Sequence, residues 1–75
     1  LVFIEVKAKY DDGLGLPEEM ISRKKVARIK KAAQWLMLKN RELARKYVRC
    51  RVDAVCILMD GNKVKKINHY QNIDW

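Results

Sequence analysis

The first eight positions, 1–8, predict a β-strand, because they open with four large apolar residues and continue with Glu5-Val6-Lys7-Ala8, in which charged and apolar residues alternate. Successive side chains of a strand point to opposite sides, so the stretch predicts one apolar face and one mixed face. The apolar face holds Val2, Ile4, Val6 and Ala8, and the mixed face holds Leu1, Phe3, Glu5 and Lys7. Because four large apolar residues open the stretch, we expect a buried strand at the centre of a sheet.

A helical period follows a loop that contains Gly15 and Pro17. Ser22 is a suitable N-cap, and from there to Asn40 apolar residues recur at three- and four-residue spacing. The predicted apolar face consists of Val26, Ile29, Ala33, Leu36 and Met37, and the opposite face of Lys24, Arg28, Lys31, Trp35 and Lys39. Gln34 lies at the border between the two faces.

The second half of the chain predicts two further strands. A short helical turn over 41–46 precedes a strand over 47–60, and the turn Asp60-Gly61-Asn62 leads into a returning strand over 63–70. Two strands joined through a helix favour a parallel pair with a right-handed crossover, whereas a hairpin is antiparallel. The predicted fold class is therefore α/β: a mixed β-sheet with a basic helix packed on it, in the order strand, helix, strand, strand.

The chain carries a large positive charge, +8, from 17 Lys and Arg against 9 Asp and Glu. Such an excess favours polyanionic partners: nucleic acid, anionic lipid or an acidic protein. Arg23, Lys24 and Lys25 stand at the predicted helix N-terminus, where the macrodipole is already positive, and this placement indicates a bound anion such as a nucleic-acid phosphate. Glu18 and Glu19 are the alternative, because they would neutralise the cluster internally.

The basic face of the helix has two interpretations. Its four cations surround Trp35, which suits a surface that follows phosphates and offers an aromatic ring for base stacking. The alternative is a solvated face whose tryptophan is covered by another part of the protein.

The two cysteines, Cys50 and Cys56, fall on the same face of one predicted strand, about 20 Å apart, which is too far for a disulfide. We expect buried free thiols in a reducing cytoplasm. A zinc site is not expected, because the chain has one His and no C-x-x-C pair. No apolar run approaches the ~20 residues of a membrane span and no signal peptide opens the chain, so we expect no membrane partner.

Five short motifs stand in order along the chain. They are Phe3-Ile4-Glu5-Val6-Lys7, Gly15 with Pro17-Glu18-Glu19, Ser22-Arg23-Lys24-Lys25, Arg51-Val52-Asp53-Ala54-Val55 and Ile67-Asn68-His69-Tyr70-Gln71-Asn72. This ordered set resembles the YraN-like family of predicted endonucleases, a branch of the restriction-endonuclease-like superfamily named for its PD-(D/E)-x-K signature. The Asp-bearing strand that precedes E-x-K in that family has no counterpart here. We therefore expect 1–75 to be one nuclease-like domain that is the C-terminal portion of a longer protein, or a truncated piece of one.

The resemblance implies a partial restriction-endonuclease-like core and metal-assisted hydrolysis of DNA phosphodiesters. Glu5 would ligate Mg²⁺ and the backbone carbonyl of Val6 would be a second ligand. Lys7 would orient or help deprotonate the attacking water, or stabilise charge on the phosphate. The structural alternative for Glu5 and Lys7 is an ion pair at the end of the strand, where the sheet meets water. Gln34 and Asp53 are accessory candidates, and pairing of Asp53 with Arg49 or Arg51 is the structural alternative.

His69 also falls at a family position, and we interpret it as a surface residue at a strand end rather than a general base. Two functions from different classes follow from these residues. The first is a metal-dependent nuclease or a nuclease-derived domain. The second is a non-catalytic basic module that binds nucleic acid through the helix face. In either case a partial sheet would favour self-association that completes it.

Overall fold

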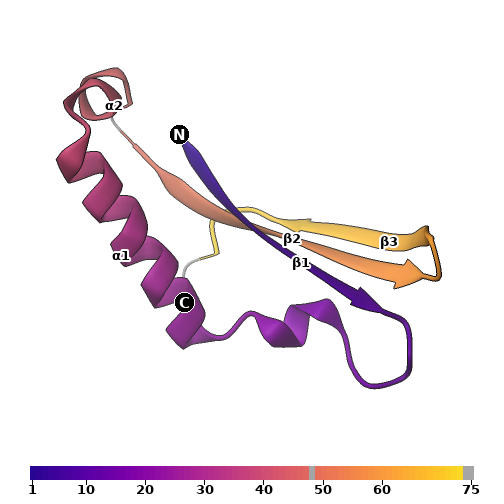
Figure 1. Cartoon of the computed structure of the whole chain (residues 1–75). Helices are drawn as coiled ribbons and strands as arrows, with labels where there is room; N and C mark the ends of the chain where they lie inside the picture. Colours follow the sequence, from indigo (N-terminus) through magenta and orange to yellow (C-terminus); the bar gives the residue numbers. More distant parts are fainter. Residues whose placement is uncertain (48, 74–75) are drawn as a thin grey trace.

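The computed structural model describes residues 1–47 and 49–73 as a three-stranded sheet with helices on one side (Figure 1). Its elements are β1 (Val2–Tyr10), a 3₁₀ turn η1 (Pro17–Met20), α1 (Arg23–Lys39), α2 (Arg41–Lys46), β2 (Arg51–Asp60) and β3 (Lys63–Tyr70). The strand order is β1-β2-β3, with β1 parallel and β3 antiparallel to β2. This mixed sheet confirms the predicted α/β class and is consistent with a partial restriction-endonuclease-like core.

Local sequence signals set the ends of the helices and the hairpin. The hydroxyl of Ser22 accepts a hydrogen bond from the backbone N–H of Lys25 at 3.1 Å, so the predicted N-cap of α1 is confirmed. Asn40 ends α1 and caps α2, since its side chain accepts from the backbone N–H of Leu43 at 3.2 Å. Gly61 opens the β2–β3 turn with φ of +57°, a conformation that glycine adopts without strain.

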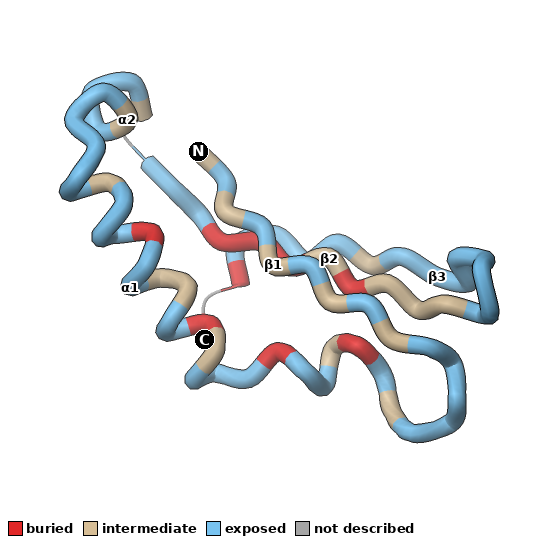
Figure 2. The backbone as a smooth tube through the Cα atoms, in the orientation of Figure 1, coloured by how far each residue is buried: buried red, intermediate tan, exposed pale blue. Residues whose placement is uncertain are grey.

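The hydrophobic core lies between one face of the sheet and the first half of α1. Val52, Ala54 and Cys56 project from β2 toward α1, and Val26 meets them from the helix. Ile21 before α1 and Ile73 after β3 complete this cluster, with Phe3 and Ile29 packed against it. Figure 2 shows these buried positions on β2 and on the side of α1 that faces the sheet. The core is small, so each buried contact carries a large part of the stability.

The prediction that the first strand is buried and central is wrong. β1 lies at an edge of the sheet and β2 is central, with β1 and β3 on either side. Val2, Ile4 and Val6 point away from α1 and are 40%, 54% and 55% exposed. The division of β1 into two faces was predicted correctly, but the apolar face is not the one that packs on the helix. The mixed face packs there instead, because Phe3 joins the core while Glu5 and Lys7 lie at its rim.

Two other boundaries differ from the prediction. β2 begins at Arg51 rather than at position 47, because Tyr47 is the C-cap of α2, and Val48 lies outside the described residues. Both cysteines are free, as expected, and Cys56 is buried. Cys50 is exposed, contrary to expectation, because it precedes the strand and therefore has no place on its packed face.

The edge position of β1 leads to a stability prediction. Ile4→Asp should lower the melting temperature of this chain by less than about 4 °C, because the new carboxylate remains in water. Val26→Ala, which deletes two buried methyl groups, should lower it by about 10 °C. Thermal unfolding followed by circular dichroism measures both, and a larger loss for Ile4→Asp would contradict the exposed face of β1.

Candidate functional site

Three charged side chains meet at the edge of the sheet, where β1 passes the N-terminus of α1. The Nζ atoms of Lys7 and Lys25 each lie 3.3 Å from the same carboxylate oxygen, Oε1 of Glu5. The side chain of Glu5 is 23% exposed, and those of Lys7 and Lys25 are 24% and 31% exposed. The group is half-buried, so its charges interact more strongly than on an open surface.

Strand alternation places Glu5 beside Lys7, and the start of α1 places Lys25. Glu5 and Lys7 are two positions apart on β1, so both point to the face that α1 covers. Lys25 occupies the first turn of α1, whose position is fixed by the Ser22 cap. Sequence analysis placed Lys25 in a basic cluster for an anion, but it did not predict the contact with Glu5. That contact crosses from helix to strand, and no local spacing encodes it.

The two lysines control the ionisation of Glu5. Partial burial by itself raises the pKa of this carboxyl group, but the hydrogen bonds and charges of Lys25 and Lys7 outweigh it and hold the pKa below its usual value. Glu5 is therefore ionised at neutral pH. Two ammonium groups and one carboxylate leave a surplus positive charge, which favours an incoming phosphate.

The remaining acidic residues do not complete a metal site around Glu5. Within the described residues, no three His, Cys, Asp or Glu side chains lie close enough to one another to hold a metal ion. Asp11 pairs with Lys65, and Asp12 accepts from the backbone N–H of Leu14 at 2.9 Å. This edge of the sheet therefore offers Mg²⁺ the carboxylate of Glu5 but no cluster of three such ligands, and Mg²⁺ is generally held by one or two carboxylates together with substrate phosphate.

Among the described residues, the side chain of Glu18 makes structural hydrogen bonds and does not pair with the cations of the first turn of α1. Its Oε2 accepts from the hydroxyl of Tyr70 at 2.7 Å and from the side-chain amide of Asn68 at 3.1 Å, which ties η1 to β3. The alternative that Glu18 neutralises the first turn of α1 is therefore not supported by its contacts, whereas Glu5 does pair with Lys25. Cys56 lies nearby, and burial raises the pKa of its thiol, so it is a poor nucleophile.

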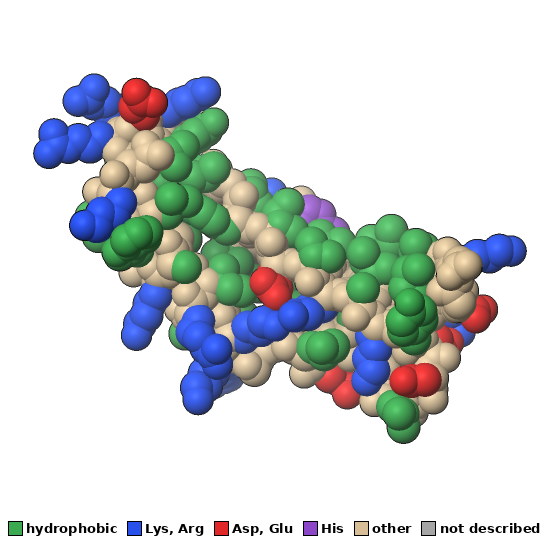
Figure 3. Space-filling model, in the orientation of Figure 1, with side chains coloured by type: hydrophobic (Ala, Val, Ile, Leu, Met, Phe, Trp, Pro, Cys, Tyr) green, Lys and Arg blue, Asp and Glu red, His purple; other side chains and the backbone are tan. Residues whose placement is uncertain are grey.

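The outer face of α1 is exposed along its whole length. Arg23, Lys24, Arg28 and Lys31 are exposed, and Trp35 is 61% exposed. The ammonium of Lys39 lies 5.9 Å from the centre of the Trp35 ring. Figure 3 shows Lys and Arg side chains gathered over α1 and α2. The structure thus groups the predicted nucleic-acid-binding residues on one continuous surface, except Lys25, which pairs with Glu5.

Asp53 lies on the other side of the sheet from Glu5. It is buried, and in the register of the parallel pair it stands beside Ile4, whereas Glu5 stands beside Ala54. Neighbouring positions on a strand point to opposite faces, so Asp53 is not a ligand at the Glu5 site. The structural alternative, pairing with Arg51, is the one that the structure shows.

The contacts of Asp53 are more extensive than sequence analysis predicted. Arg51 donates to both of its oxygens, from Nε at 3.0 Å and from Nη2 at 3.3 Å. Nε2 of His69 lies 2.8 Å from Oδ2, and the backbone N–H of Asn72 donates to Oδ1 at 2.9 Å. Two of the sequence motifs, around Asp53 and around His69, therefore meet in one network. The Asn72 hydrogen bond, together with His69 and Arg51, holds the pKa of Asp53 below its usual value in spite of burial.

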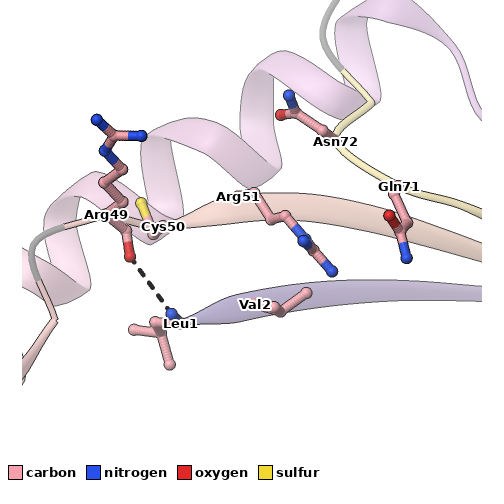
Figure 4. Close-up of a pocket in the computed structure, with 7 residues that line it drawn as sticks. All are labelled: Leu1, Val2, Arg49, Cys50, Arg51, Gln71 and Asn72. Atoms are coloured by element: carbon pink, nitrogen blue, oxygen red, sulfur yellow. Dashed lines mark hydrogen bonds between the residues drawn. The ribbon is translucent and has the colours of Figure 1, made fainter.

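Gln34 is separated from Glu5 and Lys7. It lines a cavity of about 190 Å³ between α1 and the start of β2, with Arg51 and Asn72 among the other lining residues. A second cavity of about 450 Å³ adjoins Arg49, Cys50 and Arg51 (Figure 4). Neither cavity is lined by Glu5 or Lys7, so the accessory role of Gln34 at that site has no geometric support.

Comparison with known sequences identifies the family. A sequence model described as "Uncharacterised protein family UPF0102" matches residues 1–57, which is more than half of the chain. The chain belongs to the UPF0102 family. This assignment confirms the YraN-like part of the resemblance, and the matched region includes both the Glu5–Lys7 strand and α1.

Curated UPF0102 proteins resemble the chain over nearly all of its length. The protein from Pelotomaculum thermopropionicum is 36% identical over 73 residues, which are 96% of this chain and 58% of the relative. The protein from Persephonella marina is 37% identical over 75 residues, which are 100% of this chain and 60% of the relative. The chain thus spans about three fifths of the length of these relatives. No solved structure matches it. In the part of the chain that the structure describes, no helix combines the length and the hydropathy of a membrane span.

Proposed function

We propose that the chain supplies the E-x-K half of a metal-dependent nuclease that hydrolyses DNA phosphodiesters. The observation that carries this proposal is the pairing of Glu5 with Lys7 and Lys25 at a partly buried edge of the sheet. A carboxylate beside ammonium groups is what a phosphodiesterase needs: a metal ligand next to groups that bind phosphate. Membership of the restriction-endonuclease-like superfamily is part of this proposal.

The proposal requires a second carboxylate beside Glu5. In it, Glu5 and the backbone carbonyl of Val6 would hold Mg²⁺, but the described residues place no cluster of three His, Cys, Asp or Glu side chains there. Full-length relatives are longer than this chain, and we assign the missing carboxylate to that additional part. β1 is an edge strand, so its free side can take a further strand, either from that part or from a second copy of the chain.

The lysines act on the substrate in this proposal. Their ammonium groups, now on Oε1 of Glu5, would contact the non-bridging oxygens of the phosphate and stabilise the negative charge that develops there. Lys7 would also orient the attacking water, because it lies on the same strand as Glu5. The deciding experiment is a divalent-metal-dependent cleavage assay on a full-length relative, with variants at the positions that match Glu5 and Lys7.

A non-catalytic nucleic-acid-binding module is the second candidate, and the exposed basic face of α1 favours it. The chain has a charge of +8, and the cations of this face are not neutralised by acidic residues on the helix, which has none. This candidate predicts binding without cleavage in the full-length relative as well. Cleavage by that relative would exclude it, whereas binding alone, in the presence of Mg²⁺, would support it.

Both candidates predict salt-dependent binding through α1. The affinity of the chain for duplex DNA should fall with salt by a log–log slope of about −0.9 for each phosphate contact. Lys24→Glu with Arg28→Glu should reduce that slope by about 2 and weaken binding with little dependence on sequence. Lys63→Glu with Lys66→Glu, the same charge change on β3, is the matched control and should have a much smaller effect. Equal effects of the two pairs in a titration followed by fluorescence anisotropy would remove α1 from the interface.

A further inference from the structure

The outer face of α1 also carries two large apolar side chains that the fold leaves in solvent. Trp35 is 61% exposed and Leu38 is 81% exposed, three positions apart and therefore adjacent on the helix surface. Other large apolar side chains are exposed as well, including Leu14 at 78%, but these two lie together on the face of α1 that carries the cations. Sequence analysis placed Trp35 on this face and did not single out Leu38.

Cations surround this pair. Lys31 precedes Trp35 by one helical turn, and the Lys39 ammonium lies 5.9 Å from the centre of its ring. Arg28 and Lys24 continue the same face toward the N-terminus of α1. From Lys24 to Lys39 the face is about 22 Å long, at about 1.5 Å per residue, which suits a site for several nucleotides. An aromatic ring within a row of cations is complementary to a ligand with both phosphates and exposed aromatic faces.

We propose that Trp35 and Leu38 bind unpaired bases, so that this face is selective for single-stranded nucleic acid over continuous duplex. Base pairs in a duplex are stacked on one another and present only their edges in the grooves, so a helix-borne ring finds no free base face there. In a single strand the faces are open, and stacking on an aromatic side chain adds to the phosphate contacts. The inference rests on the proposed function and adds its substrate class.

The same residues do not favour a lipid surface. A helix that lies in a membrane interface needs a broad apolar face, and the apolar face of α1, with Val26 and Ala33 buried, is packed on the sheet. On the outer face, Lys31 and Lys39 lie one helical turn before and after Trp35. This arrangement is more compatible with a polymer that alternates charge and aromatic rings than with a continuous hydrocarbon layer.

The test compares an oligo-dT of about 20 nucleotides with a duplex of equal length, using the chain and its variants in fluorescence anisotropy titrations. Trp35→Ala should weaken oligo-dT binding by about 10-fold or more and duplex binding by less than about 2-fold. Trp35→Phe, which keeps an aromatic ring, should retain most of the oligo-dT affinity. Leu38→Ala should weaken oligo-dT binding less than Trp35→Ala does. Circular dichroism confirms that each variant is folded, which is expected because both side chains are exposed.

The other outcomes overturn the inference and separate it from the proposed function. Equal losses on both ligands, or no loss on either, would show that Trp35 does not read unpaired bases. Trp35→Ala reducing adsorption to vesicles with anionic headgroups, but not oligo-dT binding, would assign the pair to a lipid surface. If the α1 charge variants weaken binding while Trp35→Ala does not, the substrate class fails and nucleic-acid binding through α1 stands. If no nucleic acid binds at low salt, both fail.

Discussion

The Glu5→Gln substitution should abolish cleavage in a full-length relative and strengthen DNA binding by this chain. In a full-length relative, the matching substitution removes a metal ligand, and loss of such a charge-stabilising group lowers kcat by about 10²–10³-fold or more. In this chain, Glu5→Gln removes the negative charge 3.3 Å from both Lys7 and Lys25, which frees both ammonium groups for phosphate. One fewer repulsive charge near a phosphate is worth about 1 kcal/mol, or roughly five-fold in affinity at low salt.

The prediction is specific because Glu5→Gln is expected to lower cleavage while it raises the affinity for DNA. Lys7→Gln should also lower cleavage but weaken DNA binding, because it removes an attractive charge. Glu42→Gln, the same chemical change at an exposed position on α2, should affect cleavage little and binding only slightly. Unchanged cleavage in the Glu5 variant would remove Glu5 from the chemistry. Weaker DNA binding by Glu5→Gln would show that the Glu5–lysine cluster does not contact phosphate.

Loss of the Asp53 charge should destabilise the chain more than any surface change. Asp53→Asn should lower the melting temperature at neutral pH by about 15 °C or more, because it leaves Arg51 without its bidentate partner and disrupts the contact with His69. The carboxylate also accepts the N–H of Asn72, next to Ile73, which is part of the core. The substitution should therefore loosen the tail that closes the core as well.

The pH dependence gives an independent readout. The pKa of Asp53 is lowered in the fold, so its contribution to stability is complete above the unfolded-state pKa of about 3.9 and is lost as pH falls through the folded-state pKa. The wild type should lose stability as the pH falls below about 4, and Asp53→Asn should lose less over the same interval. Asp60→Asn, at the exposed end of β2, is the matched control and should leave the acid unfolding curve almost unchanged. Acid denaturation followed by circular dichroism measures both variants. Identical curves for the wild type and Asp53→Asn would contradict the stabilising role of the Asp53 carboxylate.

The sequence by itself determined the elements of this protein. The β-branched and aromatic residues within 1–8, the three- and four-residue period after Ser22, and the glycine turn at Gly61 indicated the strand, the helix and the hairpin, because these patterns depend on neighbours only a few residues apart. The parallel pairing of β1 with β2 followed from the helix between them, since the crossover rule links local order to topology.

Only the tertiary structure decided which faces are buried. Apolar content predicted that Ile4 and Val6 point into the core, yet the side that packs on α1 carries Phe3, Glu5 and Lys7. Face selection depends on where the helix returns to the sheet, and alternation identifies two faces without saying which one is covered. The start of β2 was misplaced because Tyr47 is the C-cap of α2, and β-propensity alone does not show where a helix ends.

For the candidate site too, local spacing predicted some contacts and only the tertiary structure decided others. The spacing of Glu5 and Lys7 on one strand was sufficient to place them side by side, and helical spacing was sufficient to gather the cations of α1 with Trp35. The contact of Lys25 with Glu5 and the separation of Asp53 from Glu5 by the sheet depend on how α1 and β2 sit against β1. These are relations between residues 20 to 48 positions apart in the sequence, and only the packing of the three elements fixes them.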